Sequence, residues 1–309
     1  MNFILGGGIT GLITAVYFKS FGILTKGGGQ DKNYLGLHIL RSTNIVNNFI
    51  DKYVNGEVRR GEGKAITIKL ASRIYKCGFY IGNKVITRIP SKLVKEFEEK
   101  IKQNSDWVTK GEYSDIEGYD IVQVYRALVN KFDLKTRKIF LNIKKINDKE
   151  KIISGINPIH RRIKISLFYN QIINTLPVIL FNSLVEGEFV RIVNSYIYVC
   201  LLESRELSEK MKDVDFVYFP ERETPFFRIT KVGENKFCVE SEKVFIPKSD
   251  FTFACKVYKT VQIPFGKISN NVKPIDIKSA VHVGRNANSD QNLRIDKLIE
   301  MLENKEIRI

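Results

Sequence analysis

The sequence contains little cysteine and little histidine, and neither residue is clustered. The four cysteines (Cys77, Cys200, Cys238 and Cys255) are far apart and form no C-x-x-C pair, and the three histidines are scattered as well. Zinc sites need such ligands at short, regular spacings, so we expect no metal site. Dispersed cysteines with mostly hydrophobic neighbours are typical of a reducing compartment, which predicts a cytoplasmic protein.

Long hydrophobic runs are absent too. The longest, such as PVILF (177–181) and SYIYVCLL (195–202), fall far short of the roughly 20 residues that a membrane-spanning helix needs. The apolar start of the chain reaches glycine at position 6, which is too early for the hydrophobic region of a secretory signal. We therefore expect a soluble protein with no membrane partner.

Acidic residues are in deficit. The chain has 34 Asp and Glu against 50 Lys and Arg, a formal net charge of +16. This charge either keeps a solvated surface soluble or attracts a polyanion or an anionic substrate. The basic residues are spread along the chain, with small clusters at 59–64, 135–138 and 159–164, and no known nucleic-acid module is present. Both interpretations stay open, and the charge directs substrate predictions toward phosphates.

Hydrophobic residues make up 43% of the 309 residues, which is enough for a full hydrophobic core. Apolar periodicity predicts helices over 11–21, 43–54, 91–103 and 115–132, and a closing helix capped by Ser289 or Asp290. Strands are predicted at 2–5 and 23–26 and in several alternating segments, mostly between 65 and 90 and between 137 and 283. Helical segments bracketed by β-rich ones predict a mixed α/β (α+β) fold with interleaved domains.

A glycine-rich turn follows the first predicted strand. Gly6, Gly8 and Gly11 have the G-x-G-x-x-G spacing and open a predicted helix, the context in which such a turn binds the pyrophosphate of a dinucleotide. The alternative is a glycine turn without a ligand. One part of the fingerprint differs, because the second strand ends at Lys26 where an acidic residue would bind the ribose. Gln30 or Asp31 is the expected substitute.

The glycine turn and four later stretches together resemble a known superfamily. FILGGGITGL (3–12) resembles the N-terminus of FAD-binding proteins of the amine oxidase, protoporphyrinogen oxidase and UDP-galactopyranose mutase superfamily. The later stretches occur in the same order as in that superfamily, and they are LGLHILRST (35–43), YNQIINTLP (169–177), VYFPERETPFFRIT (217–230) and HVGRNANSDQNLRIDKLIE (282–300). The departures from its pattern include Lys26, Arg41 and Asn288.

The resemblance implies a Rossmann-like FAD-binding domain interleaved with an antiparallel, β-rich substrate domain. The FAD-binding domain would comprise residues 1–56, 134–185 and 272–309, and the substrate domain residues 57–133 and 186–271. The cofactor-binding residues that we predict are Gly6, Gly7, Gly8, Ile9, Thr10, Gly11, Gln30, Thr175, Gly284, Arg285 and Leu293.

Three residues are predicted to act on the substrate: His38, Arg228 and Arg285. Each has a structural alternative. His38 lies between apolar residues and could be a buried, hydrogen-bonded histidine. Arg228 follows PFF and needs an anionic partner, which is either a substrate group or a buried glutamate. Arg285 could be a surface arginine in an ordinary strand-to-helix turn.

The resemblance implies an FAD-dependent oxidoreductase, amine-oxidase-like, that takes an anionic substrate. That substrate would be a nucleotide, a nucleotide sugar or an amine-bearing group on nucleic acid. Two alternatives stay open: an isomerase of a nucleotide sugar, like UDP-galactopyranose mutase, and a flavin-free scaffold that binds nucleic acid through its basic surface.

Overall fold

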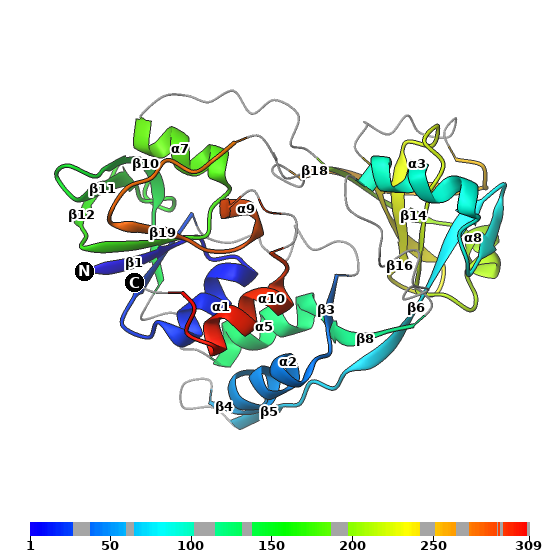
Figure 1. Ribbon diagram of the computed structural model, residues 1–309, viewed down its shortest axis with the longest axis horizontal. Helices are drawn as coiled ribbons and strands as arrows, with labels where there is room; N and C mark the ends of the chain where they lie inside the picture. The colour runs from blue at the N-terminus through cyan, green and yellow to red at the C-terminus, as the bar shows by residue number, and fades with distance from the viewer. Residues whose placement is uncertain are drawn as a thin grey trace.

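The protein is described by a computed structural model that covers residues 1–26, 38–59, 65–101, 115–131, 138–186, 197–241, 251–263, 272–288, 290 and 293–307. Two lobes stand side by side (Figure 1), and we call them the Rossmann lobe and the β lobe. None of the helices in these residues combines the length and the apolar character needed to cross a membrane.

The Rossmann lobe is built on a five-stranded parallel sheet. Its strands, in spatial order, are β19 (Ala280–His282), β13 (Gln171–Asn174), β1 (Asn2–Leu5), β2 (Gly22–Thr25) and β9 (Lys138–Phe140). All neighbours pair in parallel. The order shows that the chain leaves this sheet after β2 and after β9, and again after β13, and returns each time.

Both faces of the parallel sheet are covered, as parallel sheets require. Along β1, Ile4 joins a core with the helices α1 (Ile9–Tyr17), α5 (Ile121–Lys131) and α10 (Ile295–Glu303). Phe3 and Leu5 join a second core on the other face. That face is covered by α7 (Val178–Glu186) and by an antiparallel sheet of β10 (Asn142–Asn147), β11 (Ile152–Ile156) and β12 (Lys164–Phe168).

The β lobe contains most of a nine-stranded sheet, in which antiparallel pairs predominate. In spatial order its strands are β18 (Lys256–Ile263), β14 (Ile197–Glu203), β17 (Lys236–Ser241), β16 (Phe226–Lys231), β15 (Phe216–Tyr218), β6 (Arg73–Ile81), β8 (Asp115–Asp120) and β3 (Ile39–Arg41), with β7 (Lys84–Ile86) paired to β6. The helices α3 (Ser91–Ile101) and α8 (Arg205–Lys210) belong to this lobe.

One end of the nine-stranded sheet reaches into the Rossmann lobe. Leu40 on β3 and Tyr119 on β8 are buried in the same core as α1 and α5. The next helix, α2 (Asn44–Phe49), continues as the π-helix η2 (Ile50–Val54), and Thr43 caps α2 by accepting a hydrogen bond from Val46 N at 3.2 Å. A two-stranded sheet of β4 (Gly56–Arg59) and β5 (Ala65–Ile68) follows.

The fold class expected from the sequence is confirmed, whereas several elements differ from those predicted. Residues 115–120 form strand β8 rather than the start of a helix, because they pair with β6 and β3. In the closing helix, α10, Arg294 occupies the N-cap position without a side-chain hydrogen bond, so the cap predicted at Asp290 is wrong; Ser289 lies outside the described residues. A four-residue helix, α9 (Arg285–Asn288), precedes α10. The domain boundaries given above stay a prediction.

Candidate functional site

The glycine turn between β1 and α1 has a conformation that only glycine adopts easily. Gly6 has φ +107°, in the region that side chains disfavour. A Cβ placed on Gly11 would lie 2.0 Å from the carbonyl oxygen of Gly6, and one on Gly7 would lie 2.9 Å from Oγ1 of Thr25. The backbone is therefore packed too tightly for side chains at these positions.

Helix α1 begins in this turn. Gly8 is its N-cap, with extended backbone (φ −74°, ψ 179°) and no side chain to bond the first helical amides. The first turn of the helix contains no acidic residue. Since the first amides of a helix have no acceptor within it and the helix dipole is positive at this end, the turn favours a bound anion such as a phosphate.

Thr175 and Gly284 lie against the same turn from two other parts of the chain. Thr175 follows β13, and its hydroxyl donates to the carbonyl of Leu5 at 2.6 Å. A Cβ on Gly6 would lie 2.6 Å from the Thr175 Oγ1, and a Cβ on Gly284 would lie 2.5 Å from the methyl carbon of Thr10. Residues 6–11, 175 and 284, which the sequence predicted to share a cofactor site, are thus brought together.

The ends of β13 and β19 are tied to each other beside this turn. The Asn174 amide lies 3.1 Å from Nδ1 of His282, and the backbone N–H of Val283 donates to Asn174 O at 2.8 Å. The Asn288 amide donates to the carbonyls of His282 and Gly284, at 3.0 and 3.2 Å. These bonds fix the turn that presents Arg285.

Replacing Gly284 by alanine tests this packing. We expect the free energy of unfolding to fall by more than the roughly 1–2 kcal/mol that a left-handed alanine costs, because the new methyl group would also meet Thr10. Gly82→Ala is the matched control, since Gly82 also has positive φ (+52°) but nothing within 4 Å of the added carbon. If urea denaturation shows that the two variants lose the same free energy of unfolding, the contact between the Gly284 position and Thr10 is contradicted.

In the β lobe, Arg228 forms an ion pair with Glu240. The two residues are opposite each other on β16 and β17, and Nη2 of Arg228 donates to Oε1 of Glu240 at 2.5 Å. Only 13% and 14% of their side chains are exposed. Burial by itself would raise the pKa of Glu240, but the charge of Arg228 holds it below its usual value, so the carboxyl stays charged. Burial likewise opposes the charge of Arg228, and the Glu240 carboxylate raises the pKa of Arg228. Of the two partners predicted for Arg228, the structure shows the buried glutamate.

Tyr218 on β15 adjoins the pair. Burial raises its pKa to about 12, which the charge of Arg228 and a hydrogen bond from Arg228 partly oppose. Its ring packs against Phe97 of α3, with centroids 5.5 Å apart and an edge-on arrangement. The aromatic packing holds the strand behind the ion pair in place.

His38 immediately precedes β3, and its carbonyl accepts from Ile121 N at 2.9 Å. Its pKa is lowered to about 4, chiefly by burial; the charges of Arg228 and Arg285 contribute to the lowering, and Glu240 opposes it. The charges of Arg228 and Arg285 thus act on His38, although the three residues come from different parts of the chain. His38 is neutral at pH 7.

The remaining predicted residues are less closely defined. Arg285, on α9, is exposed to solvent. The protein around its guanidinium removes part of its hydration and lowers its pKa; Arg294 lowers it as well, and Asp290 opposes the shift. Leu293 lies half-buried between α9 and α10. Gln30 lies outside the described residues.

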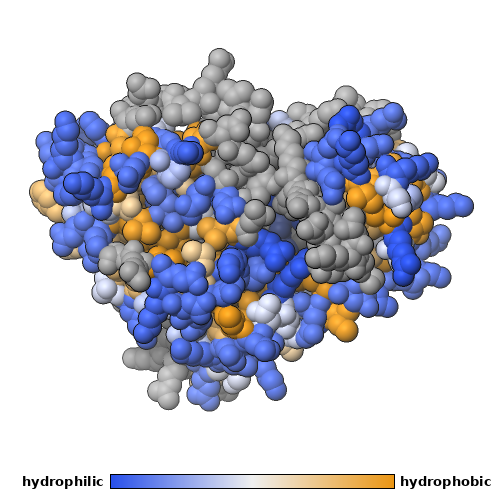
Figure 2. All heavy atoms as spheres, in the orientation of Figure 1, coloured by the Kyte–Doolittle hydropathy of each residue, from blue (hydrophilic) through white to orange (hydrophobic). Residues whose placement is uncertain are grey.

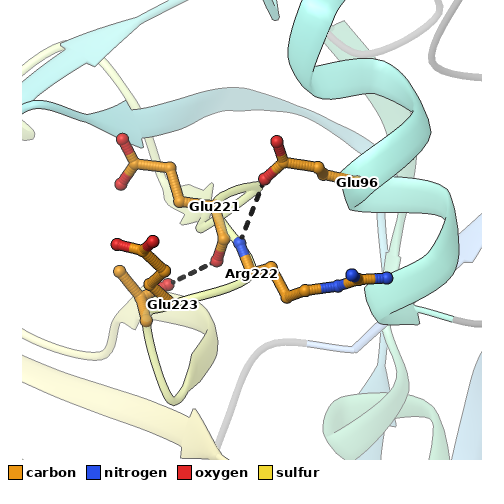
Figure 3. Close-up of a pocket in the computed structure, with 5 residues that line it drawn as sticks. Glu96, Glu221, Arg222 and Glu223 are labelled. Atoms are coloured by element: carbon orange, nitrogen blue, oxygen red, sulfur yellow. Dashed lines mark hydrogen bonds between the residues drawn. The ribbon is translucent and has the colours of Figure 1, made fainter.

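A pocket of about 410 Å³ lies elsewhere, between α3 and the turn before β16. Figure 3 shows Glu96 on α3 facing the turn of Glu221, Arg222 and Glu223. Lys100 of α3 donates to the carbonyl of Glu221 at 2.7 Å. The pocket contains none of the predicted site residues, and its carboxylates disfavour an anionic ligand.

Glu240 and Tyr218 are the site residues that the sequence interpretation missed. A signal for Glu240 was present, since the turn KVGENK (231–236) joins two alternating strands and places Arg228 opposite a residue near 240. Tyr218 belongs to the stretch 217–230 that carries the resemblance, and it lies directly opposite Arg228 on the neighbouring strand β15, although it was not among the predicted site residues.

The fold and the site together define a class of architecture: a Rossmann lobe with a glycine turn, joined to a β lobe whose sheet carries charged residues. No family model matches the chain, and no curated protein matches it by sequence.

Solved structures have this architecture. The chain is similar to reduced UDP-galactopyranose mutase, with 14% identity, a TM-score of 0.57, and coverage of 98% of this chain and 95% of that one. It is similar to an oxidoreductase from Methanosarcina mazei (11% identity, TM-score 0.54, 99% of each chain). It is also similar to L-proline dehydrogenase from P. horikoshii (12% identity, TM-score 0.52, 99% and 94%). At these identities the likeness shows the fold, and the resemblance seen in the sequence is confirmed at that level.

Proposed function

We propose that the chain binds FAD in the Rossmann lobe and is an FAD-dependent oxidoreductase. The observation that carries the proposal is the turn at Gly6, Gly8 and Gly11, where bare backbone and the start of α1 offer a site for a pyrophosphate. Gly284 and Thr175 lie against it from distant parts of the chain.

The described residues fit FAD in two respects. Gly6 and Gly11 have no room for a Cβ, as the tight turn and the close helix packing of a dinucleotide motif require, and the first turn of α1 contains no carboxylate to repel a pyrophosphate. Gly6, Gly7, Gly8, Ile9, Thr10 and Gly11 would hold the phosphates, with Thr175, Gly284, Arg285 and Leu293 beside them and Gln30 near the ribose. FAD would supply hydride acceptance.

Arg285 on α9, Arg228 in the β lobe and His38 would orient the substrate. Since Glu240 already neutralises Arg228, Arg285 is the better reader of an anionic group, and Arg228 serves as a fixed hydrogen-bond donor. His38, being neutral, can donate or accept a hydrogen bond at pH 7 without adding charge. The substrate class that we propose is anionic: nucleotide-linked, or an amine-bearing group on nucleic acid. The net charge of +16 supports this choice.

The reaction can be tested with the FAD-loaded protein under anaerobic conditions. An oxidoreductase substrate should bleach the oxidised flavin absorption near neutral pH. Arg285→Gln should raise the concentration needed for half-bleaching far more than Lys305→Gln, a surface control. If nucleotide-linked and nucleic-acid-borne amines, presented at low salt, neither bleach nor perturb the spectrum, the anionic-substrate proposal is wrong.

The second candidate is a nucleotide-sugar isomerase like UDP-galactopyranose mutase. The end-to-end match in fold to that enzyme favours it. The state of the flavin distinguishes the two functions. A mutase converts UDP-galactopyranose with the flavin already reduced and with no net oxidation. An oxidoreductase consumes its oxidised flavin.

The pKa of His38 gives a pH-dependent prediction. In the folded protein this pKa is about 4, below the 6.5 of an unfolded histidine. Below pH 6.5 the unfolded chain therefore gains a proton that the folded chain does not, so stability falls as the pH drops from 6.5 to 4, by at most about 3 kcal/mol. His38→Gln should remove this part of the dependence in denaturation at several pH values. A His38 signal that titrates near 6.5 in NMR would contradict it.

A further inference from the structure

The sheet of β10, β11 and β12 has an outer face that the proposed function leaves without a role. Its inner face, with Ile146, Ile153 and Leu167, packs into the core under the parallel sheet. The strand register places another set of residues together on the outside, in three rows: Asn142, Ile156 and Lys164; Lys145, Ser154 and Ser166; Asn147, Ile152 and Phe168.

Large apolar side chains stand in solvent on this sheet. Phe168 is 71% exposed at the end of β12, which pairs only with β11 within the described residues and is thus an edge strand. Ile159 and Ile163 are also exposed, in the loop that joins β11 to β12. Figure 1 places these strands at the left edge of the molecule. At that edge, Figure 2 shows a hydrophilic surface with apolar residues among the hydrophilic ones.

The same sheet is strongly basic. Residues 151–170 contain four Lys or Arg and no Asp or Glu. Arg161, Arg162 and Lys164 are exposed, as is Lys145 on β10, and none of these four forms an ion pair with another described residue.

The acidic groups nearest in sequence are engaged elsewhere. Asp148, in the turn after β10, is paired with Lys151 at 2.6 Å and accepts from the Tyr169 hydroxyl at 3.0 Å. Glu150 accepts from the Asn147 amide at 2.8 Å. The cations near the β11–β12 loop therefore keep their charge available for an anionic partner.

We propose that the outer face of the β10–β11–β12 sheet binds single-stranded nucleic acid. Proteins that bind single strands combine cations along the phosphates with aromatic side chains on which bases stack. Phe168 would stack a base, and Lys145, Arg161, Arg162 and Lys164 would contact phosphates. A lipid surface fits less well, because Lys164 and Ser166 separate Phe168 and its register partner Ile152 from Ile159 and Ile163, so the exposed apolar residues form no continuous face.

The test is the fluorescence anisotropy of a labelled single-stranded oligonucleotide of mixed sequence, titrated with the full chain over a salt series. We expect Phe168→Ala to weaken binding by about tenfold, within the range for a lost stacking contact. Arg161→Gln with Arg162→Gln should lower the slope of log K against log salt by about 1.4, since each phosphate contact on a single strand contributes about 0.7.

A matched control is available on the other lobe. Tyr258 on the edge strand β18 is 50% exposed, and the Lys256 ammonium lies 5.5 Å from its ring, so it resembles Phe168 in exposure and neighbouring charge. Tyr258→Ala should leave binding unchanged. All four substituted side chains are exposed, and circular dichroism would verify that the variants fold.

Four outcomes would overturn the proposal. They are no binding at low salt, equal losses for Phe168→Ala and Tyr258→Ala, a preference for duplex over single strands, and binding to phosphatidylserine vesicles in place of the oligonucleotide. None of these results depends on whether the chain binds FAD, so the two proposals fail separately.

Discussion

Gly8→Val should yield a folded protein that no longer retains FAD. The backbone of Gly8 is extended (φ −74°, ψ 179°), a conformation open to any residue, so valine does not strain it. Its side chain would instead stand at the start of α1, where we place the pyrophosphate. We expect the dissociation constant for FAD to rise by about 100-fold or more, equivalent to about 3 kcal/mol.

Isothermal titration with FAD measures this effect, with circular dichroism as the check on folding. Gly233→Val is the control, because Gly233 lies in the turn between β16 and β17 and a Cβ there meets only the Lys236 side chain, at 3.4 Å or more. Unchanged FAD affinity in a folded Gly8→Val protein would show that the turn is not the cofactor site. Gly8→Ala, with its smaller side chain, should give an intermediate loss.

Of the single substitutions in the β lobe that are predicted here, Glu240→Ala should lower the free energy of unfolding most. It would leave the Arg228 guanidinium buried and without its carboxylate, which typically costs about 3–5 kcal/mol. The double variant Arg228→Met with Glu240→Leu should recover most of this loss, because two apolar side chains need no partner. Urea denaturation measures both.

The control for this prediction is an exposed ion pair. Lys297 and Glu300 on α10 are 51% and 37% exposed, so Glu300→Ala should cost at most about 1 kcal/mol. A Glu240→Ala protein as stable as Glu300→Ala would mean that solvent reaches Arg228 freely. Since the pKa of Glu240 lies below its usual value, the stabilisation by the pair should be present at neutral pH and should be lost as the pH falls through that pKa.

Local sequence patterns predicted the parts of the fold that depend on local chemistry. The glycine spacing predicted the β1–α1 turn, because a positive φ at Gly6 and the tight contact at Gly11 admit no other residue. The helix predicted over 43–54 is present as α2 and η2, and Thr43 caps it by accepting a hydrogen bond from Val46 N.

The parts that depend on distant pairing were not predictable in the same way. Residues 115–120 read as helix because Ile and Tyr recur at helical spacing, and only their pairing with β6 and β3 makes them a strand. In the candidate site, Arg228 was identified as needing an anionic partner, and the hairpin turn at 231–236 indicates a residue near 240 opposite it. Only the observed register of β16 on β17 identifies that residue as Glu240.

The central claim is that this chain binds FAD, and the visible absorption spectrum of the purified protein tests it most directly. We expect the visible absorption bands of an oxidised flavin, and release of FAD rather than FMN on heat denaturation, as a Rossmann-type dinucleotide site implies. A colourless, folded protein that neither releases flavin nor acquires it when incubated with excess FAD would contradict the account.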